Sequence, residues 1–243
     1  MNAPMNFEKG APSGSSRERL VVIGNGMAGC RAVEEILARD PGRFDVTIFG
    51  AEPRVNYNRI MLSPVLAGEK TFDEIVINTQ EWYDDNRITL VSGDKVDSID
   101  REHKRVVAAS GRIEPYDKLL IATGSDPFII PVPGKDLDGV VTFRDLDDVD
   151  KMVAAAGKGG SAVVIGGGLL GLEAAHGLNL RGMQVTVIHL MPTLMERQLD
   201  EAAGWLLKTE LERRGQTILT GANTKEIVGK GGKVSAVRLE DGT

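Results

Sequence analysis

The sequence contains very little cysteine and histidine, and each shortage excludes a class of site. Its 243 residues include one cysteine and three histidines. One cysteine cannot build a disulfide framework, a cysteine-rich zinc site or a CxxC redox pair within these residues. Three histidines leave little material for a histidine metal cluster. We therefore expect no metal site in this part of the chain.

Long apolar runs and basic runs are also missing. Lys and Arg number 29 against 35 Asp and Glu, a net charge of −6, which argues against nucleic acid as a partner. No apolar run reaches the roughly 18 residues of a membrane-spanning helix. Residues 1–18 lack the apolar core of a secretory signal, and their Gly, Pro, Ser and Asn content indicates a flexible tail. We expect a cytoplasmic protein that does not bind membranes.

Two segments of the chain repeat each other. Residues 19–31 (RLVVIGNGMAGCR) and 161–173 (SAVVIGGGLLGLE) each hold a β-branched apolar run, a GxGxxG pattern and the start of a helical pattern. A second apolar strand follows each helix, at 44–49 and 184–188. The order strand, glycine loop, helix, strand predicts an α/β fold of two Rossmann-like units with parallel sheets.

The remaining segments suggest the domain limits. Residues 94–110 alternate like a β-hairpin insertion, 116–123 resemble a strand, and 126–134 hold three prolines. Residues 232–240 resemble one strand of a hairpin whose turn is Asp241-Gly242, and the pattern stops there. We expect a C-terminally truncated fold, with a tail at 1–18, a first dinucleotide domain at 19–126, a crossing linker at 127–144 and an incomplete second domain at 145–243.

The glycine loops predict two dinucleotide sites. In such loops the glycines permit a tight turn, a close approach of backbone to a pyrophosphate, and close packing of helix on strand. The helix N-terminus then offers its N–H groups to the phosphates. The strand–loop–helix context supports the motif twice. The candidate binding residues are Gly24, Gly26, Met27, Ala28 and Gly29 in the first loop, and Gly166, Gly167, Gly168, Leu169, Leu170 and Gly171 in the second.

A residue after the second strand of each unit is expected to read the ribose. In the first unit this is Glu52, whose carboxylate can accept both ribose hydroxyls; the alternative is an ordinary loop glutamate. In the second unit we take His189 as the matching position. Histidine selects neither NADH nor NADPH, so the choice stays open with a preference for NADH. A purely structural His189 is the alternative.

Two dinucleotides in one chain suggest a relay from a nicotinamide to a flavin. Such a transfer depends on ring stacking more than on acid–base residues. This explains why no Ser/His/Asp or paired-carboxylate arrangement stands out.

The motifs resemble the FAD- and NAD-dependent pyridine nucleotide oxidoreductases over nearly all of residues 19–243. They comprise the two loops, Glu52-Pro53, and residues 116–124 (YDKLLIATG). Residues 57–63 (YNRIMLS) and 190–200 (LMPTLMERQLD) are most similar to the N-terminal reductase part of NAD(P)H nitrite reductase large subunits, with rubredoxin reductases as the next relatives.

The resemblance implies roles for individual residues. The first loop would bind the pyrophosphate of FAD and the second that of NAD(P)H. Glu173, two residues past Gly171, would face the nicotinamide and flavin as the catalytic residue. Further FAD contacts would come from Glu52, Arg59, Ser63, Thr123 and Gly124.

Several departures from the family pattern qualify these roles. Pro64 follows Leu62-Ser63, where many relatives carry a lysine, and no cysteine pair follows Glu52, so disulfide reductase chemistry is excluded. A second FAD motif is missing after Gly171, so we expect incomplete retention of FAD.

The resemblance implies an electron-input module that passes electrons to iron–sulfur and sirohaem centres in a downstream part, for reduction of nitrite to ammonia. The alternatives are a stand-alone NAD(P)H rubredoxin or ferredoxin reductase, and a non-catalytic flavin-binding redox sensor. The expected partner is an electron acceptor, either a downstream domain or a small carrier protein. A homodimer is possible.

Overall fold

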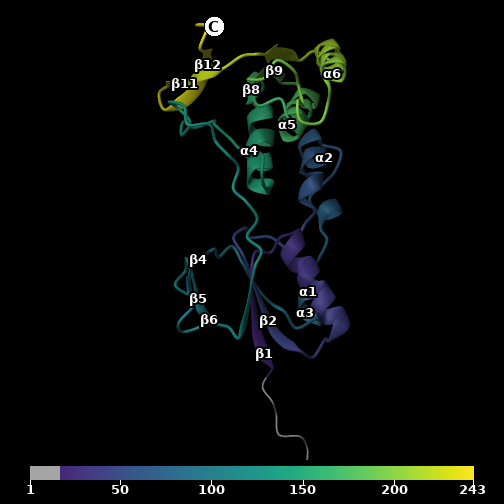
Figure 1. The fold of residues 1–243 in the computed structure, drawn as a ribbon, viewed down its shortest axis with the longest axis vertical. Helices are drawn as coiled ribbons and strands as arrows, with labels where there is room; N and C mark the ends of the chain where they lie inside the picture. Colours follow the sequence, from purple (N-terminus) through teal and green to yellow (C-terminus); the bar gives the residue numbers. More distant parts are fainter. Residues whose placement is uncertain (1–16) are drawn as a thin grey trace, which may run out of the picture. The chain divides into compact units, whose positions relative to one another are not determined.

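A computed structural model of the chain describes residues 17–243 (Figure 1). The predicted flexible tail therefore falls almost wholly outside the described residues, and the first strand begins at Glu18. The chain divides into two compact units. The first unit contains residues up to 56 together with 78–124, and the second contains 57–77 together with 125–243.

The first unit is built on a parallel four-stranded sheet in the order β3-β2-β1-β7. Apolar residues alternate along its strands, so Val22 and Ile48 face the helical side, where they pack with Val33 and Tyr83. The elements are β1 (Glu18–Ile23), α1 (Met27–Arg39), β2 (Phe44–Gly50), α3 (Gln80–Asp85), β3 (Thr89–Ser92) and β7 (Lys118–Ile121).

A small antiparallel sheet covers the other face. It runs through β4 (Val96–Asp100), β5 (Arg105–Ala108) and β6 (Ile113–Pro115). Val21 and Phe49 of the large sheet pack against Val106 of β5, so the hairpin completes the core. The predicted hairpin at 94–110 is confirmed, and β6 is an additional strand.

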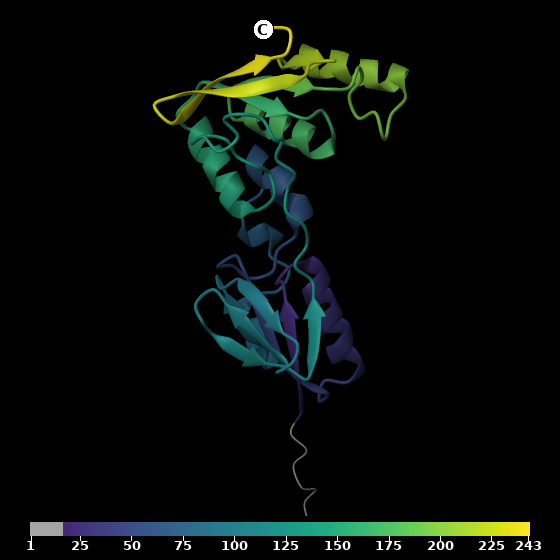
Figure 2. The same ribbon diagram turned by 60° about the vertical axis from the view of Figure 1, so that its left-hand side comes forward.

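The second unit repeats the first arrangement with a three-stranded parallel sheet, in the order β10-β9-β8. Figure 2 shows most of this unit in green and yellow. The two-unit α/β fold with parallel sheets is thus confirmed. The elements are α4 (Leu146–Ala156), β8 (Ser161–Ile165), α5 (Leu169–Leu180), β9 (Gln184–His189), α6 (Glu201–Arg213) and β10 (Thr217–Thr220).

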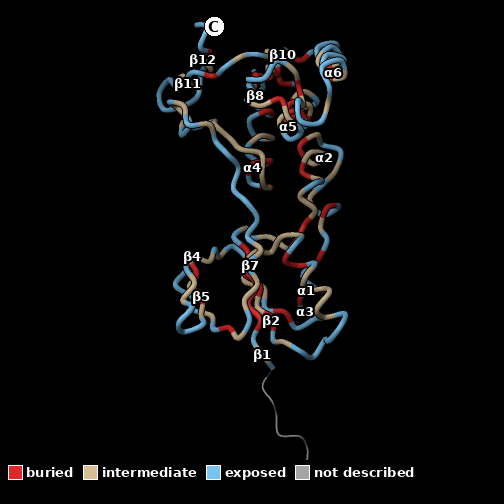
Figure 3. The backbone as a smooth tube through the Cα atoms, viewed as in Figure 1, coloured by how far each residue is buried: buried red, intermediate tan, exposed pale blue. Residues whose placement is uncertain are grey.

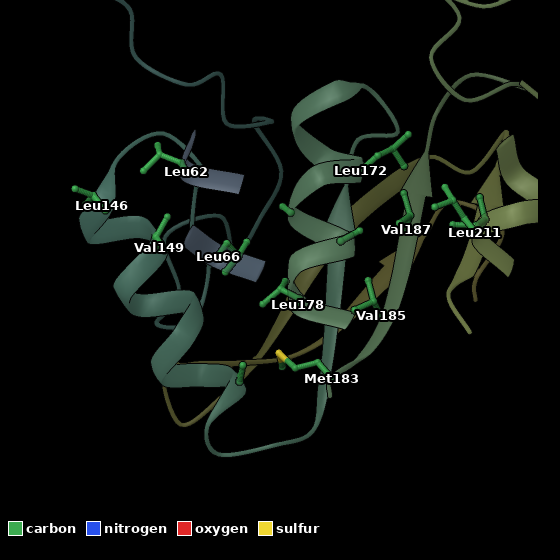
Figure 4. Packing of buried hydrophobic residues seen from close by; sticks show 14 of the residues in the cluster. Leu62, Leu66, Leu146, Val149, Leu172, Leu178, Met183, Val185, Val187 and Leu211 are labelled. Atoms are coloured by element: carbon green, nitrogen blue, oxygen red, sulfur yellow. The ribbon is translucent and has the colours of Figure 1, made fainter. Parts of the chain in front are cut away.

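Residues 57–77 join this second unit as η1 (Arg59–Met61), α2 (Leu62–Ala67) and η2 (Asp73–Ile75). Gly177 of α5 allows Leu66 to pack closely, because a Cβ at Gly177 would lie 2.8 Å from the Leu66 Cγ. The Arg181 guanidinium donates to the carbonyls of Leu66 and Val65. Figure 4 shows Leu66 within this core, with side chains of α4 and α5 around it.

A hairpin of β11 (Thr224–Lys230) and β12 (Lys233–Leu239) follows. The predicted strand at 232–240 is confirmed as β12. The predicted turn at Asp241-Gly242 directly follows this strand, and the Gly242 N–H donates to the Leu239 carbonyl at 3.1 Å. The turn that joins β12 to β11 was not predicted. It lies at Gly231 and Gly232, which both have positive φ angles (62° and 80°).

The connecting segment 125–129 is exposed and has no regular structure (Figure 3). The predicted domain limits at 126, 127–144 and 145 stay a prediction. No helix among residues 17–243 has the length and apolar character needed to cross a membrane.

Candidate functional site

The first glycine loop joins the carboxyl end of β1 to α1. Gly24 has φ +116°, and its N–H donates to the Phe49 carbonyl at 2.8 Å. A Cβ at Gly24 would lie 2.2 Å from the Ala122 carbonyl oxygen, and one at Gly29 would lie 2.4 Å from the Gly24 oxygen. Glycine is therefore required at both positions, by the turn at Gly24 and by helix–strand packing at Gly29.

The second loop has almost the same geometry. Gly166 has φ +126°, and its N–H donates to the Ile188 carbonyl at 2.8 Å. A Cβ at Gly171 would lie 2.0 Å from the Gly166 oxygen. The two loops are equivalent structures in two units.

The middle glycines leave the helix N-termini open. Gly26 and Gly168 are the N-cap residues of α1 and α5, and a Cβ at either would meet nothing within 4 Å. Neither helix has a side-chain cap, whereas Asp145 and Asp200 cap α4 and α6. The N–H groups of the first turns of α1 and α5, at Met27, Ala28, Gly29, Leu169, Leu170 and Gly171, are thus the donors that an α-helix leaves without an internal partner. These two open helix ends fit the phosphates of a dinucleotide.

Other predicted residues of the first unit gather at the same sheet edge. Because β1, β2 and β7 are parallel, their carboxyl ends coincide, and the half-buried Glu52 follows β2 by two residues. Thr123 lies beside the loop, since its backbone nitrogen is 3.1 Å from where a Gly24 Cβ would be. Gly124, with φ +77°, follows it.

His189 ends β9 and is nearly buried, with 9% of its surface exposed. Its Nδ1 accepts the Gly167 N–H at 3.1 Å. This leaves the proton on Nε2, which donates to the Glu196 Oε2 at 3.1 Å. The backbone N–H of Glu196 and this imidazole hold the Glu196 pKa below its ordinary value.

Strand register shows which residue of the first unit corresponds to His189. Ile23 pairs with Phe49 in the first unit, and Ile165 pairs with Ile188 in the second. His189, the last residue of β9, is therefore the counterpart of Gly50, the last residue of β2. The role of His189 in reading the ribose stays a prediction.

Glu173 and Ser63, predicted separately, lie together in the second unit. Ser63 Oγ on α2 donates to the Glu173 Oε2 on α5 at 2.5 Å. Arg59 lies in the same unit, where its Nη1 donates to the Arg144 carbonyl at 2.9 Å. The contacts of Arg59 and Ser63 with FAD stay a prediction.

The residues that anchor the first loop were not predicted from the sequence. The Asn25 amide donates to the Arg54 carbonyl at 3.1 Å, and the Tyr83 hydroxyl donates to the Asn25 Oδ1 at 2.7 Å. Burial raises the Tyr83 pKa, so the hydroxyl keeps its proton. The one available signal was Asn25 itself, which stands where the second loop has glycine. Tyr83 lies 58 residues further along and carries no local signal.

Among residues 17–243, no group of three or more His, Cys, Asp or Glu side chains could hold a metal ion.

Comparison with known proteins places these loops in a family. The chain is 53% identical to nitrite reductase [NAD(P)H] of Bacillus subtilis, over 93% of this chain and 28% of that protein. It is 46% identical to the assimilatory nitrate reductase electron transfer subunit of the same organism, over 93% of this chain and 29% of that protein. The chain thus spans less than a third of the length of either relative.

The fold matches the solved structure of NADH:rubredoxin oxidoreductase from Clostridium acetobutylicum with a TM-score of 0.76 and 32% identity, covering 86% of this chain and 54% of that one. The family model for pyridine nucleotide-disulphide oxidoreductases matches residues 18–243. The chain therefore belongs to the pyridine nucleotide-disulphide oxidoreductase family.

Proposed function

We propose that this chain is an NAD(P)H-dependent flavin oxidoreductase module, with FAD on the first glycine loop and NAD(P)H on the second. The observation that carries the proposal is the pair of equivalent loops, each opening onto a helix that has no side-chain cap. One such site would serve a single nucleotide. Two sites in one chain suit a donor and an acceptor of electrons.

The residues of the first unit would bind and orient FAD. The N–H groups at the start of α1 would hold the pyrophosphate, because the open space at Gly26 admits a phosphate close to the backbone. Glu52, just past β2, would accept the ribose hydroxyls, and Thr123 with Gly124 would border the same sheet edge.

The second unit would do the same for NAD(P)H through Gly166, Gly168 and Gly171. When bound, the nicotinamide supplies a hydride and the flavin accepts it. Glu173 is our candidate for the catalytic residue, and its carboxylate is held in place by the Ser63 hydroxyl. The choice between NADH and NADPH stays open with a preference for NADH, because His189 at the end of β9 is neither the acid that favours NADH nor the arginine that favours a 2′-phosphate.

For the acceptor we propose iron–sulfur and sirohaem centres outside these residues, with nitrite reduced to ammonia. Support comes from the 53% identity to a nitrite reductase. An alternative is a stand-alone NAD(P)H rubredoxin or ferredoxin reductase, which the likeness to NADH:rubredoxin oxidoreductase supports. A cytoplasmic location and a homodimer stay predictions, as does the third possibility, a redox sensor without turnover.

A matched pair of substitutions tests the assignment of the two loops. Gly26→Asp and Gly168→Asp each place a carboxylate in open space at an N-cap, where aspartate is well tolerated by the helix. The charge would repel a phosphate there. We expect Gly26→Asp to weaken FAD binding at least tenfold and leave NADH binding intact, and Gly168→Asp to do the reverse, as measured by calorimetry.

Gly26→Ala and Gly168→Ala serve as controls for lost backbone freedom. If neither aspartate variant alters binding of FAD, NADH or NADPH, the proposal is wrong.

Anaerobic mixing of the FAD-loaded chain with NADH then separates an enzyme from a sensor, because only hydride transfer bleaches the flavin absorbance. Assays of the whole gene product for ammonia from nitrite, against reduction of purified rubredoxin, separate the two acceptors.

A further inference from the structure

In each unit the glycine loop contacts the end of the second strand. The anchoring side chain lies on the loop in the first unit and on the strand in the second. Gly24 corresponds to Gly166, so Asn25 in the first loop corresponds to Gly167 in the second. Strand register makes Gly50 the counterpart of His189. Each unit therefore pairs a glycine with a larger polar residue, but the two positions have exchanged their roles.

In the first unit the larger residue lies on the loop. A Cβ at Gly50 would approach the Asn25 Cβ to 2.9 Å, so the strand end must be small. The Asn25 side chain then reaches the Arg54 carbonyl and the Tyr83 hydroxyl. These bonds fix the loop through its own side chain.

In the second unit the larger residue lies on the strand. A Cβ at Gly167 would approach the His189 Cγ to 2.8 Å and the Leu194 Cδ2 to 2.5 Å. The Gly167 N–H donates to the imidazole, and the Gly167 carbonyl accepts the Met195 N–H at 3.0 Å. The peptide groups on both sides of Gly167 are thus held by the segment from His189 to Met195.

We propose that His189 is a positioning residue for the second glycine loop, which it holds through the Gly167 N–H, and that it does not read the ribose. This inference rests on the proposed binding of NAD(P)H to that loop. Both ring nitrogens already have protein partners, Gly167 and Glu196, so neither is left for a ribose hydroxyl.

The physical effect is preorganisation. A loop with glycine at 166, 167 and 168 has a large conformational entropy when nothing restrains it, and binding a pyrophosphate would have to remove that freedom. The bonds from His189 and Met195 restrain the middle of this run before the nucleotide arrives. Removing the histidine acceptor should therefore weaken nucleotide binding without removing any contact to the nucleotide.

Two substitutions at this residue separate positioning from general packing. In His189→Asn the carboxamide oxygen can take the place of Nδ1 and accept the Gly167 N–H. In His189→Leu the volume is largely kept and the acceptor is lost. With the full 243-residue chain and NADH as the probe in calorimetry, we expect His189→Leu to raise the Kd at least tenfold and His189→Asn to stay within about threefold of wild type.

FAD affinity and the thermal midpoint are the internal controls, because the first loop has its own anchor in Asn25. Equal NADH affinity in wild type and His189→Leu would overturn the inference. So would a His189→Asn variant as weak as His189→Leu.

A second measurement does not depend on binding or on either variant folding. The imidazole ¹⁵N spectrum of wild type should show His189 protonated at Nε2 only, with the Gly167 amide proton coupled across its bond to Nδ1. Protonation at Nδ1 would contradict the inference. If wild type binds neither NADH nor NADPH, the proposed function fails, while this spectrum still decides whether the anchor exists.

Discussion

The thiol of Cys30 directly follows the last glycine of the first loop, at the start of α1. A helix N-terminus can activate a thiol, but here the side chain is fully buried. Its Sγ donates to the Asn25 Oδ1 at 3.2 Å, beside the Tyr83 hydroxyl. Burial raises the Cys30 pKa to about 11, so the neutral thiol packs as a small apolar group.

We predict that native Cys30 reacts very slowly with a thiol reagent such as DTNB at pH 8, because both the thiolate fraction and access are small. The same chain in urea should react at the rate of a free thiol. The measurement is the absorbance of released thionitrobenzoate, with the urea sample as its control. Rapid stoichiometric reaction of the folded chain would show that the thiol is accessible.

At the scale of elements, local sequence patterns were enough to predict the strand–loop–helix units, because the glycines and β-branched runs of each unit follow one another in sequence. The short strand β6 was not predicted, since it has only three residues and one of them is a proline. The pairing of Ser63 with Glu173, 110 residues apart, likewise depends on how α2 packs on α5. The loops of the candidate site could therefore be predicted, but not the side chains that hold them.

We predict that replacing the third glycine of each loop by alanine destabilises the fold more than replacing the second glycine. A methyl group from Gly29→Ala or Gly171→Ala would collide with a backbone carbonyl oxygen and force the helix away from its strand, which should cost about 1–3 kcal/mol. Gly26→Ala and Gly168→Ala enter open space and should change the free energy of unfolding by no more than about 1 kcal/mol. Urea unfolding measures all four. Equal destabilisation at both positions would argue against the observed packing.

At the scale of the whole molecule, ion pairs of the first unit make stability depend on pH. Asp117 precedes β7 and accepts hydrogen bonds from Arg19 of β1, from its backbone N–H at 2.8 Å and its Nε at 3.0 Å. The Arg19 guanidinium and backbone N–H hold the Asp117 pKa well below its usual range. The His103 backbone N–H, the His103 ring and Arg105 lower the Asp100 pKa to about 2, against the cost of desolvation.

Because these pKa values are depressed in the folded state, their stabilisation is complete above the ordinary aspartate value of 3.8 and is lost as the pH falls towards 2 and below. We predict that the urea midpoint falls steeply over this interval, and that Asp117→Asn makes the fall shallower. Asp97→Asn, at an exposed aspartate of β4, is the matched control. If the urea midpoint of Asp117→Asn fell with decreasing pH as steeply as that of wild type, the prediction would be wrong.

The exchanged contact beneath the two glycine loops also limits how such units can diverge. If both descend from one ancestral unit, the pair of positions changed from one arrangement to the other through single substitutions. A chain with large residues at both positions would clash, as the close approaches at Gly50 and Gly167 show. A chain with glycine at both positions would only lose an anchor. Single substitutions could therefore convert one arrangement into the other only through a form with glycine at both positions, whose loop would lack its side-chain anchor.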